Sequence, residues 1–270
     1  MPCPLVLCYF LGSELPAEVR EPMPVRETEA IILRTYPFQE ADKIVSFLSR
    51  GEGRTRGIAP NARRSVKRFG ASLEPLSHVR MRYQEQPSRE LVRVESCELL
   101  ESFFDIQGNY EVAVGSSYVA EVCEQLLPER EANDAFFRLV LLVMSEFRRG
   151  GEIWRPLTYF DLWAIKLAGF LPPLDECIRC RAVLEAGQTA WFHPQWDGLL
   201  CRDCRGEEAW TLSPESRKLA HTMSSAALPS VPDKGWSRSR GEDLRRFLGQ
   251  QMERHLERKL VTRRQLDTLS

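Results

Sequence analysis

Residues 78–83 read His-Val-Arg-Met-Arg-Tyr, and residues 90–95 read Glu-Leu-Val-Arg-Val-Glu. Apolar and polar side chains come close to alternating in both runs, and such alternation indicates a strand with one buried face. Three more short runs of apolar and β-branched residues precede them, at 29–34, 43–49 and 55–59. Glycine and proline punctuate the gaps. Five strands in about 75 residues predict a small closed or nearly closed β-barrel.

The pattern becomes helical after residue 104. We expect helices over residues 110–127, 134–149, 154–168, about 214–224 and 243–266. The second helix is apolar on nearly all sides, so we expect it at the centre of a helical core. A barrel followed by helices predicts an α+β protein with more than one domain.

Length and composition bound the class of protein. The chain has 270 residues, 43% of them apolar and 28% charged, which is normal for one large or two ordinary globular domains. The formal net charge of -1 excludes a basic nucleic-acid-binding tail and an acidic disordered chain. No run of about 18 apolar residues occurs, so we expect no membrane span. The apolar stretch 4–11 has no Lys or Arg before it and no cleavage motif after it, which favours a cytoplasmic protein.

Charge is segregated along the chain. Residues 1–42 hold three basic and seven acidic residues, whereas residues 43–93 hold twelve basic and four acidic. Residues 101–170 return to six basic against eleven acidic, and residues 235–264 hold nine basic against four acidic. A basic amino-terminal domain and a basic carboxy-terminal helix therefore flank an acidic middle. Any charge-driven binding must come from this local segregation.

Eight cysteines provide the strongest local signal. Cys177, Cys180, Cys201 and Cys204 follow the spacing C-x2-C-x20-C-x2-C. Thiols stay reduced in the cytoplasm, and four thiolates in this pattern form the closed tetrahedral shell that structural Zn²⁺ prefers. We therefore predict a structural zinc site, with His193 as a turn residue rather than a ligand. The remaining cysteines lack such spacing and are interpreted as packing or incidental residues: Cys3, Cys8, Cys97 and Cys123.

No catalytic motif accompanies the predicted zinc site. A zinc deaminase carries H-x-E upstream of P-C-x-x-C, and a catalytic zinc keeps an open coordination position. The sequence also has no G-x-x-x-x-G-K-[ST] phosphate loop, no G-x-S-x-G elbow and no H-E-x-x-H pair. We therefore predict that the protein is not an enzyme.

The second signal is a cluster of basic residues between positions 50 and 68. Seven basic residues stand there against one acid, Glu52. They fall on strand ends and in a loop of the predicted barrel, where cations can follow a phosphate backbone and Phe69 or the arginine planes can stack on bases. The predicted DNA-binding residues are Arg50, Arg54, Arg56, Arg63, Arg64, Lys67 and Arg68.

Together these features resemble the RecO family of bacterial recombination mediators over residues 26–266. The resemblance rests on four features: the opening run 29–45, the glycine-rich turn at 51–53 with the basic loop that ends at residue 68, the four cysteines, and the amphipathic helix predicted over 243–266. It implies an OB-fold barrel over residues 23–101 and a helical domain over 102–270 with a zinc-binding insertion at about 174–207. Residues 1–22 have no counterpart in the family pattern and form an extension of unclear status. Pro60-Asn61 stands where the family usually has a glycine.

The resemblance also implies a function. Proteins of this family bind single- and double-stranded DNA and anneal complementary strands. With RecR they help to load RecA onto strands coated by single-strand-binding protein (SSB), whose acidic carboxy-terminal tail binds their helical domain. We therefore expect a cytoplasmic, nucleoid-associated DNA-repair mediator with structural Zn²⁺, whose partners are DNA, RecR and SSB, and indirectly RecA. No short motif locates the RecR or SSB surface.

Two other interpretations stay open from the residues alone. A zinc-ribbon adaptor or transcription factor would carry the same four cysteines, with the basic cluster only a solvated face. An unrecognised hydrolase is the other alternative. Binding to single strands of unrelated sequence separates the first from a mediator, and turnover of nucleotides or nucleic acid would identify the second.

Overall fold

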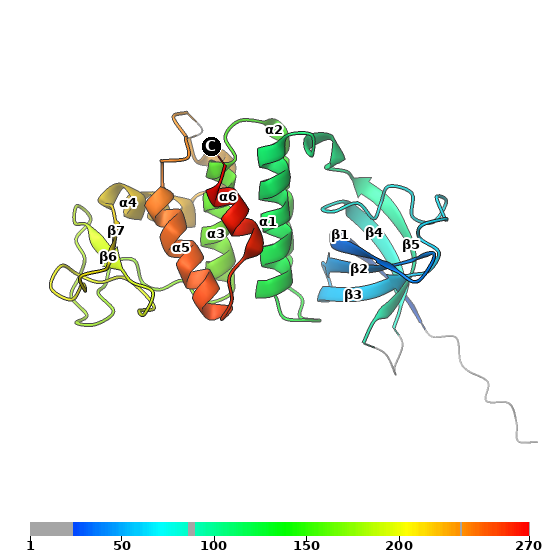
Figure 1. Cartoon of the computed structure of the whole chain (residues 1–270), viewed down its shortest axis with the longest axis horizontal. Helices are drawn as coiled ribbons and strands as arrows, with labels where there is room; N and C mark the ends of the chain where they lie inside the picture. The colour runs from blue at the N-terminus through cyan, green and yellow to red at the C-terminus, as the bar shows by residue number, and fades with distance from the viewer. Residues whose placement is uncertain (1–23, 86–89, 233, 270) are drawn as a thin grey trace, which may run out of the picture.

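The computed structural model describes residues 24–85, 90–232 and 234–269. A β-barrel lies at one end of the molecule, a bundle of helices in the middle and a small two-stranded sheet at the other end (Figure 1). The predicted extension over residues 1–22 lies outside the described residues. Within the described ranges, no helix is long and apolar enough to cross a membrane.

Five strands close the barrel in the order β1-β2-β3-β5-β4. Strands β3 and β5 run parallel, and every other neighbouring pair is antiparallel. This five-stranded closed sheet confirms the predicted barrel of OB type. The strands are β1 (Val25–Phe38), β2 (Asp42–Ser49), β3 (Gly53–Ala59), β4 (His78–Gln84) and β5 (Val92–Glu101).

Alternation of side chains builds the barrel as the sequence predicted. In β4 the side chains of Val79, Met81 and Tyr83 are buried, whereas Arg80 and Arg82 are exposed. Strand β1 is long enough to pair with β4 along its first half and with β2 along its second half. A shift of register between Ile32 and Arg34 lets the strand bend between its two partners.

The closure between β3 and β5 depends on Gly57. A Cβ atom at this position would lie 2.8 Å from Cγ2 of Val92 and 2.9 Å from Cγ2 of Val94. Both valines are buried in the barrel core, so there is no space for them to move aside. A residue without a side chain is therefore required where these two strands meet.

Six α-helices and two short 3-10 helices follow the barrel in the described part of the chain. They are η1 (Phe104–Ile106), α1 (Tyr110–Leu126), α2 (Asp134–Arg149), α3 (Trp154–Leu167), α4 (Pro214–Ser225), η2 (Leu228–Ser230), α5 (Glu242–His255) and α6 (Val261–Asp267). Asn109, Asn133 and Ser213 cap α1, α2 and α4 with their side-chain oxygens. The first three predicted helices and the helix from Pro214 are confirmed.

The centre of the bundle is α3 rather than α2, which corrects the sequence interpretation. Helix α3 packs against α2, α4 and α5, and it is buried without interruption from Trp154 to Leu162. Helix α2 keeps an exposed edge at Arg138 and Arg149. The apolar run in α2 therefore contributes one broad face to the core.

The predicted final helix over 243–266 is wrong, because the structure divides it into α5 and α6. Glu257 between them adopts a left-handed conformation with φ of 52°. The buried carboxylate of Glu121 on α1 accepts hydrogen bonds from the backbone N–H of Val261 at 2.9 Å and of Thr262 at 2.8 Å. A carboxylate that binds free N–H groups stabilises a new helix start there.

The barrel and the bundle share packed surfaces. Ile31 and Leu33 of β1 belong to the same apolar core as the helices, and Arg34 forms an ion pair with Glu124 of α1 at 3.1 Å. Gly53 at the start of β3 has φ of 70°, and a Cβ atom there would lie 1.8 Å from the carbonyl oxygen of Glu131. The acidic connection between α1 and α2 therefore lies directly on the edge of β3.

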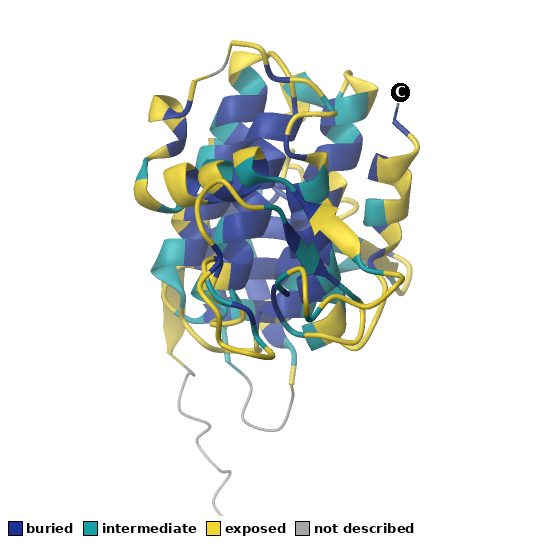
Figure 2. Cartoon of the chain, turned by 90° about the vertical axis from the view of Figure 1, so that its left-hand side faces the viewer, coloured by how far each residue is buried: buried dark blue, intermediate teal, exposed yellow. Residues whose placement is uncertain are grey.

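The segment with the four cysteines forms the end of the molecule opposite the barrel (Figure 1). Strand β6 (Ala190–Phe192) pairs with β7 (Trp210–Leu212), and Trp191 also forms a β-bridge with Leu200, so residues 191–200 make a hairpin. Figure 2 looks onto this end and shows exposed loops in front of a buried helical core.

Candidate nucleic-acid interface and metal centre

The outer face of β1, β2 and β3 presents an apolar row flanked by arginines. Strand register places Tyr36 beside Ile44, Ile44 beside Ile58, and Ile58 beside Arg93 of β5. Tyr36 is 44% exposed and the two isoleucines are partly exposed. An exposed aromatic ring beside cations is the usual platform for unpaired bases.

The next row on this face contains Arg34, Ser46 and Arg56. The strand register pairs Arg34 of β1 with Ser46 of β2, and Ser46 with Arg56 of β3. At the other side of the apolar row, Phe38, Ile58, Pro60 and Arg93 line a hollow of about 230 Å³. Sequence analysis missed Tyr36 and Arg93. Their outward positions in alternating strands were the signal that could have found them.

Four predicted DNA-binding residues lie together in the connection between β3 and β4. Arg63 donates to the backbone carbonyl of Glu40 at 3.1 Å, and Arg68 donates to the backbone carbonyl of Pro60 at 2.6 Å. Among the residues that the structure describes, no carboxylate contacts Arg63, Arg64, Lys67 or Arg68. Four cations are therefore available to an external anion at this place.

The loop is held in place by backbone contacts rather than by charge pairs. Asn61 adopts φ of 55°, the left-handed conformation that a glycine would take, and its N–H donates to Asp42 Oδ1 at 2.8 Å. Phe69 is only 2% exposed and packs in the barrel core. The prediction that Phe69 stacks on bases is wrong, because this ring anchors the loop to the barrel.

The other three predicted DNA-binding residues contact the acidic segment of the helical domain. Arg54 and Arg56 of β3 both reach Glu129 Oε1, at 3.1 and 3.3 Å. Arg54 is also mostly buried, and its Nε donates to the backbone carbonyl of Leu127 at 2.9 Å. Arg50 forms ion pairs with Asp134 at 2.7 Å and Glu29 at 3.1 Å. These arginines thus have partners that a charge count along the chain could not show.

The structure brings the four predicted metal ligands together. The Sγ atoms of Cys177, Cys180, Cys201 and Cys204 all lie within 4.8 Å of one another, and those of Cys180 and Cys201 are 3.6 Å apart. Tetrahedral coordination at about 2.3 Å would separate two sulfur atoms by about 3.8 Å. The four cysteines are therefore compatible with one metal ion. His193 lies in the turn directly after β6, and its Nδ1 accepts a hydrogen bond from the backbone N–H of Gln195 at 3.1 Å.

The donor set fits a thiophilic metal chemically. Burial raises the pKa of the Cys177 thiol, but hydrogen bonds from the backbone N–H groups of Cys180, Cys201 and Arg179 outweigh this effect and hold the pKa at about 6. The thiolate is the form that binds metal. The other described cysteines, Cys97 and Cys123, are buried in the barrel and in α1, in agreement with a packing role. Cys3 and Cys8 lie outside the described residues.

Arg217 of α4 attaches the metal-binding segment to the helices. Its side chain is 2% exposed, and it donates to the backbone carbonyls of Leu174 at 3.0 Å and Leu184 at 2.6 Å. It also contacts the carboxylate of Asp175 at 3.1 Å. A buried guanidinium that spreads its donors over several acceptors holds this loop-rich segment in a defined place.

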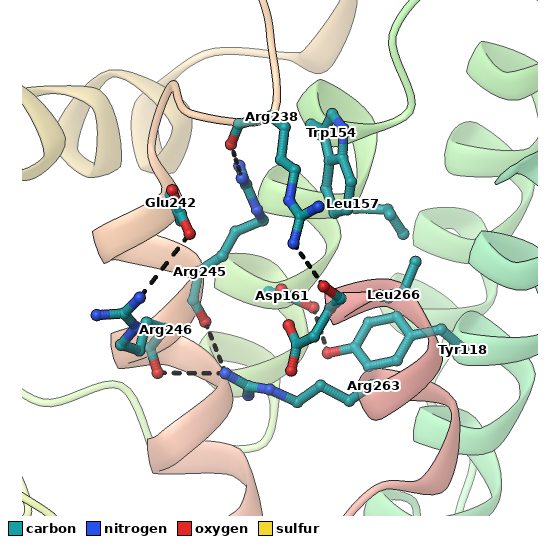
Figure 3. Close-up of a pocket in the computed structure, with 11 residues that line it drawn as sticks. Tyr118, Trp154, Leu157, Asp161, Arg238, Glu242, Arg245, Arg246, Arg263 and Leu266 are labelled. Atoms are coloured by element: carbon teal, nitrogen blue, oxygen red, sulfur yellow. Dashed lines mark hydrogen bonds and ion pairs between the residues drawn. The ribbon is translucent and has the colours of Figure 1, made fainter. Parts of the chain in front are cut away.

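A cavity of about 300 Å³ in the helical bundle is lined by four arginines and an apolar wall (Figure 3). The wall consists of Trp154, Leu157 and Leu266. Three of the guanidiniums bind backbone carbonyls; Arg238, for example, donates to that of Asp267 at 2.5 Å. Among the described residues, only Arg246 of the four forms an ion pair, with Glu242 at 3.8 Å. The arginines are Arg238, Arg245, Arg246 and Arg263.

Two titratable groups in this cavity are perturbed by burial. Burial raises the pKa of Asp161 to about 6, although its Oδ1 accepts a hydrogen bond from the hydroxyl of Tyr118 at 2.7 Å. Burial also lowers the pKa of Arg245 to about 10. The cavity is lined by three carboxylates, those of Asp161, Glu242 and Asp267, against four guanidiniums. The cations exceed the carboxylates by one, and by two when Asp161 is protonated, which favours an anionic ligand.

Comparison with known proteins agrees with this architecture. The family described as "Recombination protein O N terminal" matches residues 23–103, and "Recombination protein O C terminal" matches residues 107–264. A DNA repair protein RecO from Koribacter versatilis is 46% identical over 245 residues, which cover 91% of this chain and 99% of that protein. The chain belongs to the RecO family.

Other RecO proteins show the same relationship at lower identity. The DNA repair protein RecO from Anaeromyxobacter sp. (strain Fw109-5) is 30% identical over 88% of this chain and 93% of that protein. The one from Nocardioides sp. is 33% identical over 70% of this chain and 78% of that protein. RecO membership confirms the resemblance drawn from the residues and establishes a role in DNA repair.

Proposed function

We propose that this RecO-family protein is a non-enzymatic recombination mediator that binds DNA, anneals complementary single strands and, with RecR, promotes loading of RecA onto SSB-coated strands. The observation that carries the proposal is the loop of Arg63, Arg64, Lys67 and Arg68, whose cations contact no carboxylate in the described structure. They lie on an OB-type barrel beside the exposed apolar row of Tyr36, Ile44 and Ile58. That combination suits a flexible, charged strand with accessible bases.

Annealing by such a surface needs no covalent chemistry. Two complementary strands repel each other through their phosphates, and bound cations reduce this repulsion while the bases stay free to search for partners. We place the strand across β1, β2 and β3, with a base on Tyr36 and phosphates near Arg93 and the loop. A zinc-ribbon adaptor would not require this exposed row. Binding of single strands therefore distinguishes a mediator from an adaptor.

We place the acidic tail of SSB in the arginine-lined cavity. Its guanidiniums suit carboxylates, and the wall of Trp154 and Leu157 suits an apolar side chain next to them. Binding of a peptide with the acidic tail sequence tests this placement. Arg263→Glu reverses a charge in the cavity, whereas the matched control Arg258→Glu reverses an exposed charge that contacts Gln125 instead. Only the first variant should lose the peptide.

We propose Zn²⁺ as the metal held by Cys177, Cys180, Cys201 and Cys204. A closed shell of four cysteines gives zinc a structural role, since no coordination position is left for a substrate. We also propose domain limits at 23–101 for the barrel and 102–270 for the helices with the metal-binding segment at about 174–207. A cytoplasmic, nucleoid-associated location follows from the proposed DNA binding.

The decisive experiment is the annealing rate of two complementary SSB-coated oligonucleotides over a salt series. The wild-type protein is compared with the triple variant Arg63→Glu/Arg64→Glu/Lys67→Glu. If the proposal is right, the wild type accelerates annealing and the folded triple variant does not. If neither protein binds strands at about 50 mM salt, the mediator proposal is wrong and the adaptor interpretation takes its place.

A further inference from the structure

A second aromatic and cationic surface lies where the segment with the four cysteines meets the ends of α3 and α5. Phe170, Arg179, Trp196, Arg254 and His255 compose it, and we call it the hairpin-tip surface. Trp196 is 38% exposed and Phe170 is 36% exposed, although large aromatic side chains are usually buried. Figure 2 looks onto the segment with the four cysteines and colours much of its loops as exposed. Neither the barrel nor the arginine-lined cavity includes these residues.

Side-chain contacts join the five residues through the turn around Asp197. Arg179 lies over the Trp196 ring, with its guanidinium carbon 5.0 Å from the ring centroid. The ring of His255 stacks on Phe170 at 4.1 Å between centroids and 9° between planes, and His255 contacts Asp197 at 3.2 Å. Arg254 donates to the backbone carbonyl of Pro194 at 2.8 Å, which brings its charge to the same turn.

The charges of this surface favour an anionic ligand. Arg179 and Arg254 are both exposed, and in the described part of the chain each donates to a backbone carbonyl rather than to a carboxylate. The one carboxylate in the turn, Asp197, lies 3.2 Å from the ring of His255. Two exposed guanidiniums that pair with no carboxylate of the described residues, beside two exposed ring systems, suit phosphates and unpaired bases together.

We propose that the hairpin-tip surface is a second binding site for single-stranded nucleic acid. Bases stack on Trp196 and on the Phe170 side of the ring pair, and the phosphates lie near Arg179 and Arg254. A duplex hides the faces of its bases inside the stack, so this surface selects single strands. Arg179 and Trp196 belong to the segment with the four cysteines, which lies at the end of the molecule opposite the barrel (Figure 1). One molecule can therefore hold two strands, or one strand at two places.

The test separates this surface from the barrel loop. Full-length protein carrying the triple loop variant Arg63→Glu/Arg64→Glu/Lys67→Glu is titrated with a labelled oligothymidylate, alone and combined with Trp196→Ala. Trp210→Ala is the matched control, because Trp210 is 40% exposed on the neighbouring strand β7. Loss of one stacked base weakens binding about 5- to 150-fold, and only Trp196→Ala should do so.

A second readout does not depend on affinity. Oligonucleotides with 5-iodouracil, irradiated with the wild-type protein, should cross-link to Trp196 or Phe170 as well as to the barrel. The double variant Arg179→Ala/Arg254→Ala should reduce the salt slope of the residual binding by about 1.4, or about 0.7 for each phosphate contact. Melting temperature and metal content, both unchanged, establish that the variants are folded.

The possible outcomes distinguish this inference from the proposed function. Residual strand binding that Trp196→Ala removes supports the hairpin-tip surface, whatever the loop contributes. No residual binding in the triple loop variant overturns the second site and leaves the barrel site in place. Equal affinities of Trp196→Ala and Trp210→Ala also overturn it, and this surface would then be assigned to a protein partner.

Discussion

We propose that Glu129 competes with DNA for the arginines of β3, and we therefore expect Glu129→Gln to strengthen binding to single strands. Its Oε1 contacts Arg54 at 3.1 Å and Arg56 at 3.3 Å. Arg54 has an exposed side-chain fraction of 18% and keeps its bond to Leu127, so only Arg56, at 45%, becomes available. An exposed ion pair contributes about 0.2–1 kcal/mol. Removing this competition should therefore increase affinity about 1.5- to 5-fold.

The salt dependence provides the sharper measurement. The four loop cations and Arg93 predict a slope of log affinity against log salt of about -3.5, and one more engaged arginine makes it about -4.2. Fluorescence anisotropy with an oligothymidylate between about 50 and 200 mM salt measures this change. Glutamine retains a hydrogen-bond acceptor for Arg54, so we expect little change in the free energy of unfolding.

Two controls identify the cause of the change. Glu98→Gln removes the same charge from the barrel at a residue that pairs with Arg80 at 3.0 Å. In the double variant Glu129→Gln/Arg56→Ala the gain should disappear, because the released arginine is missing. If Glu98→Gln strengthens binding as much as Glu129→Gln, the effect is one of net charge and the competition is refuted.

Three further perturbations test other parts of the structure. Tyr36→Ala should weaken single-strand binding about 5- to 150-fold with little effect on duplex binding, and equal losses on both would exclude stacking at this ring. Cys201→Ser should lose the metal and the local fold of its segment, whereas Cys123→Ser should keep the metal content by elemental analysis; equal metal content in both would remove the predicted site. Because burial raises the pKa of Asp161 to about 6, the stability that its protonation provides is complete below about pH 4 and is lost as pH rises through 6. Asp161→Asn should lack this loss, so urea unfolding at pH 5 and 8 should show the variant gaining about 1–2 kcal/mol relative to wild type; a constant difference would contradict the raised pKa.

The barrel was predictable because its information is local. Alternation in β4 and the strand runs before it determine which side chains are buried, and the first three strands are joined by short connections. The four cysteines were predictable for the same reason, since two short C-x2-C turns bring the sulfur atoms together. Metal binding itself stays a prediction.

Other features depend on contacts between distant residues. The break before α6 requires Glu121, which lies 140 positions before the N–H of Val261 that it binds. The pairing of Arg56 requires Glu129 from the connection after α1. A count of charges along the sequence cannot distinguish the seven basic residues of the cluster. In the structure, Arg50, Arg54 and Arg56 contact acidic residues, whereas the four basic residues of the β3–β4 loop contact none among the described residues.

The arginine-lined cavity is made from residues as far apart in the chain as Tyr118 and Asp267. On the ribosome, the five strands of the barrel are complete once residue 101 has emerged, whereas α6 has to be synthesised before the cavity has its last wall. A nascent chain can therefore complete its barrel well before it completes the arginine-lined cavity. If the two proposed sites are right, strand binding should appear before peptide binding during translation, so the two would be separated in time as well as in space.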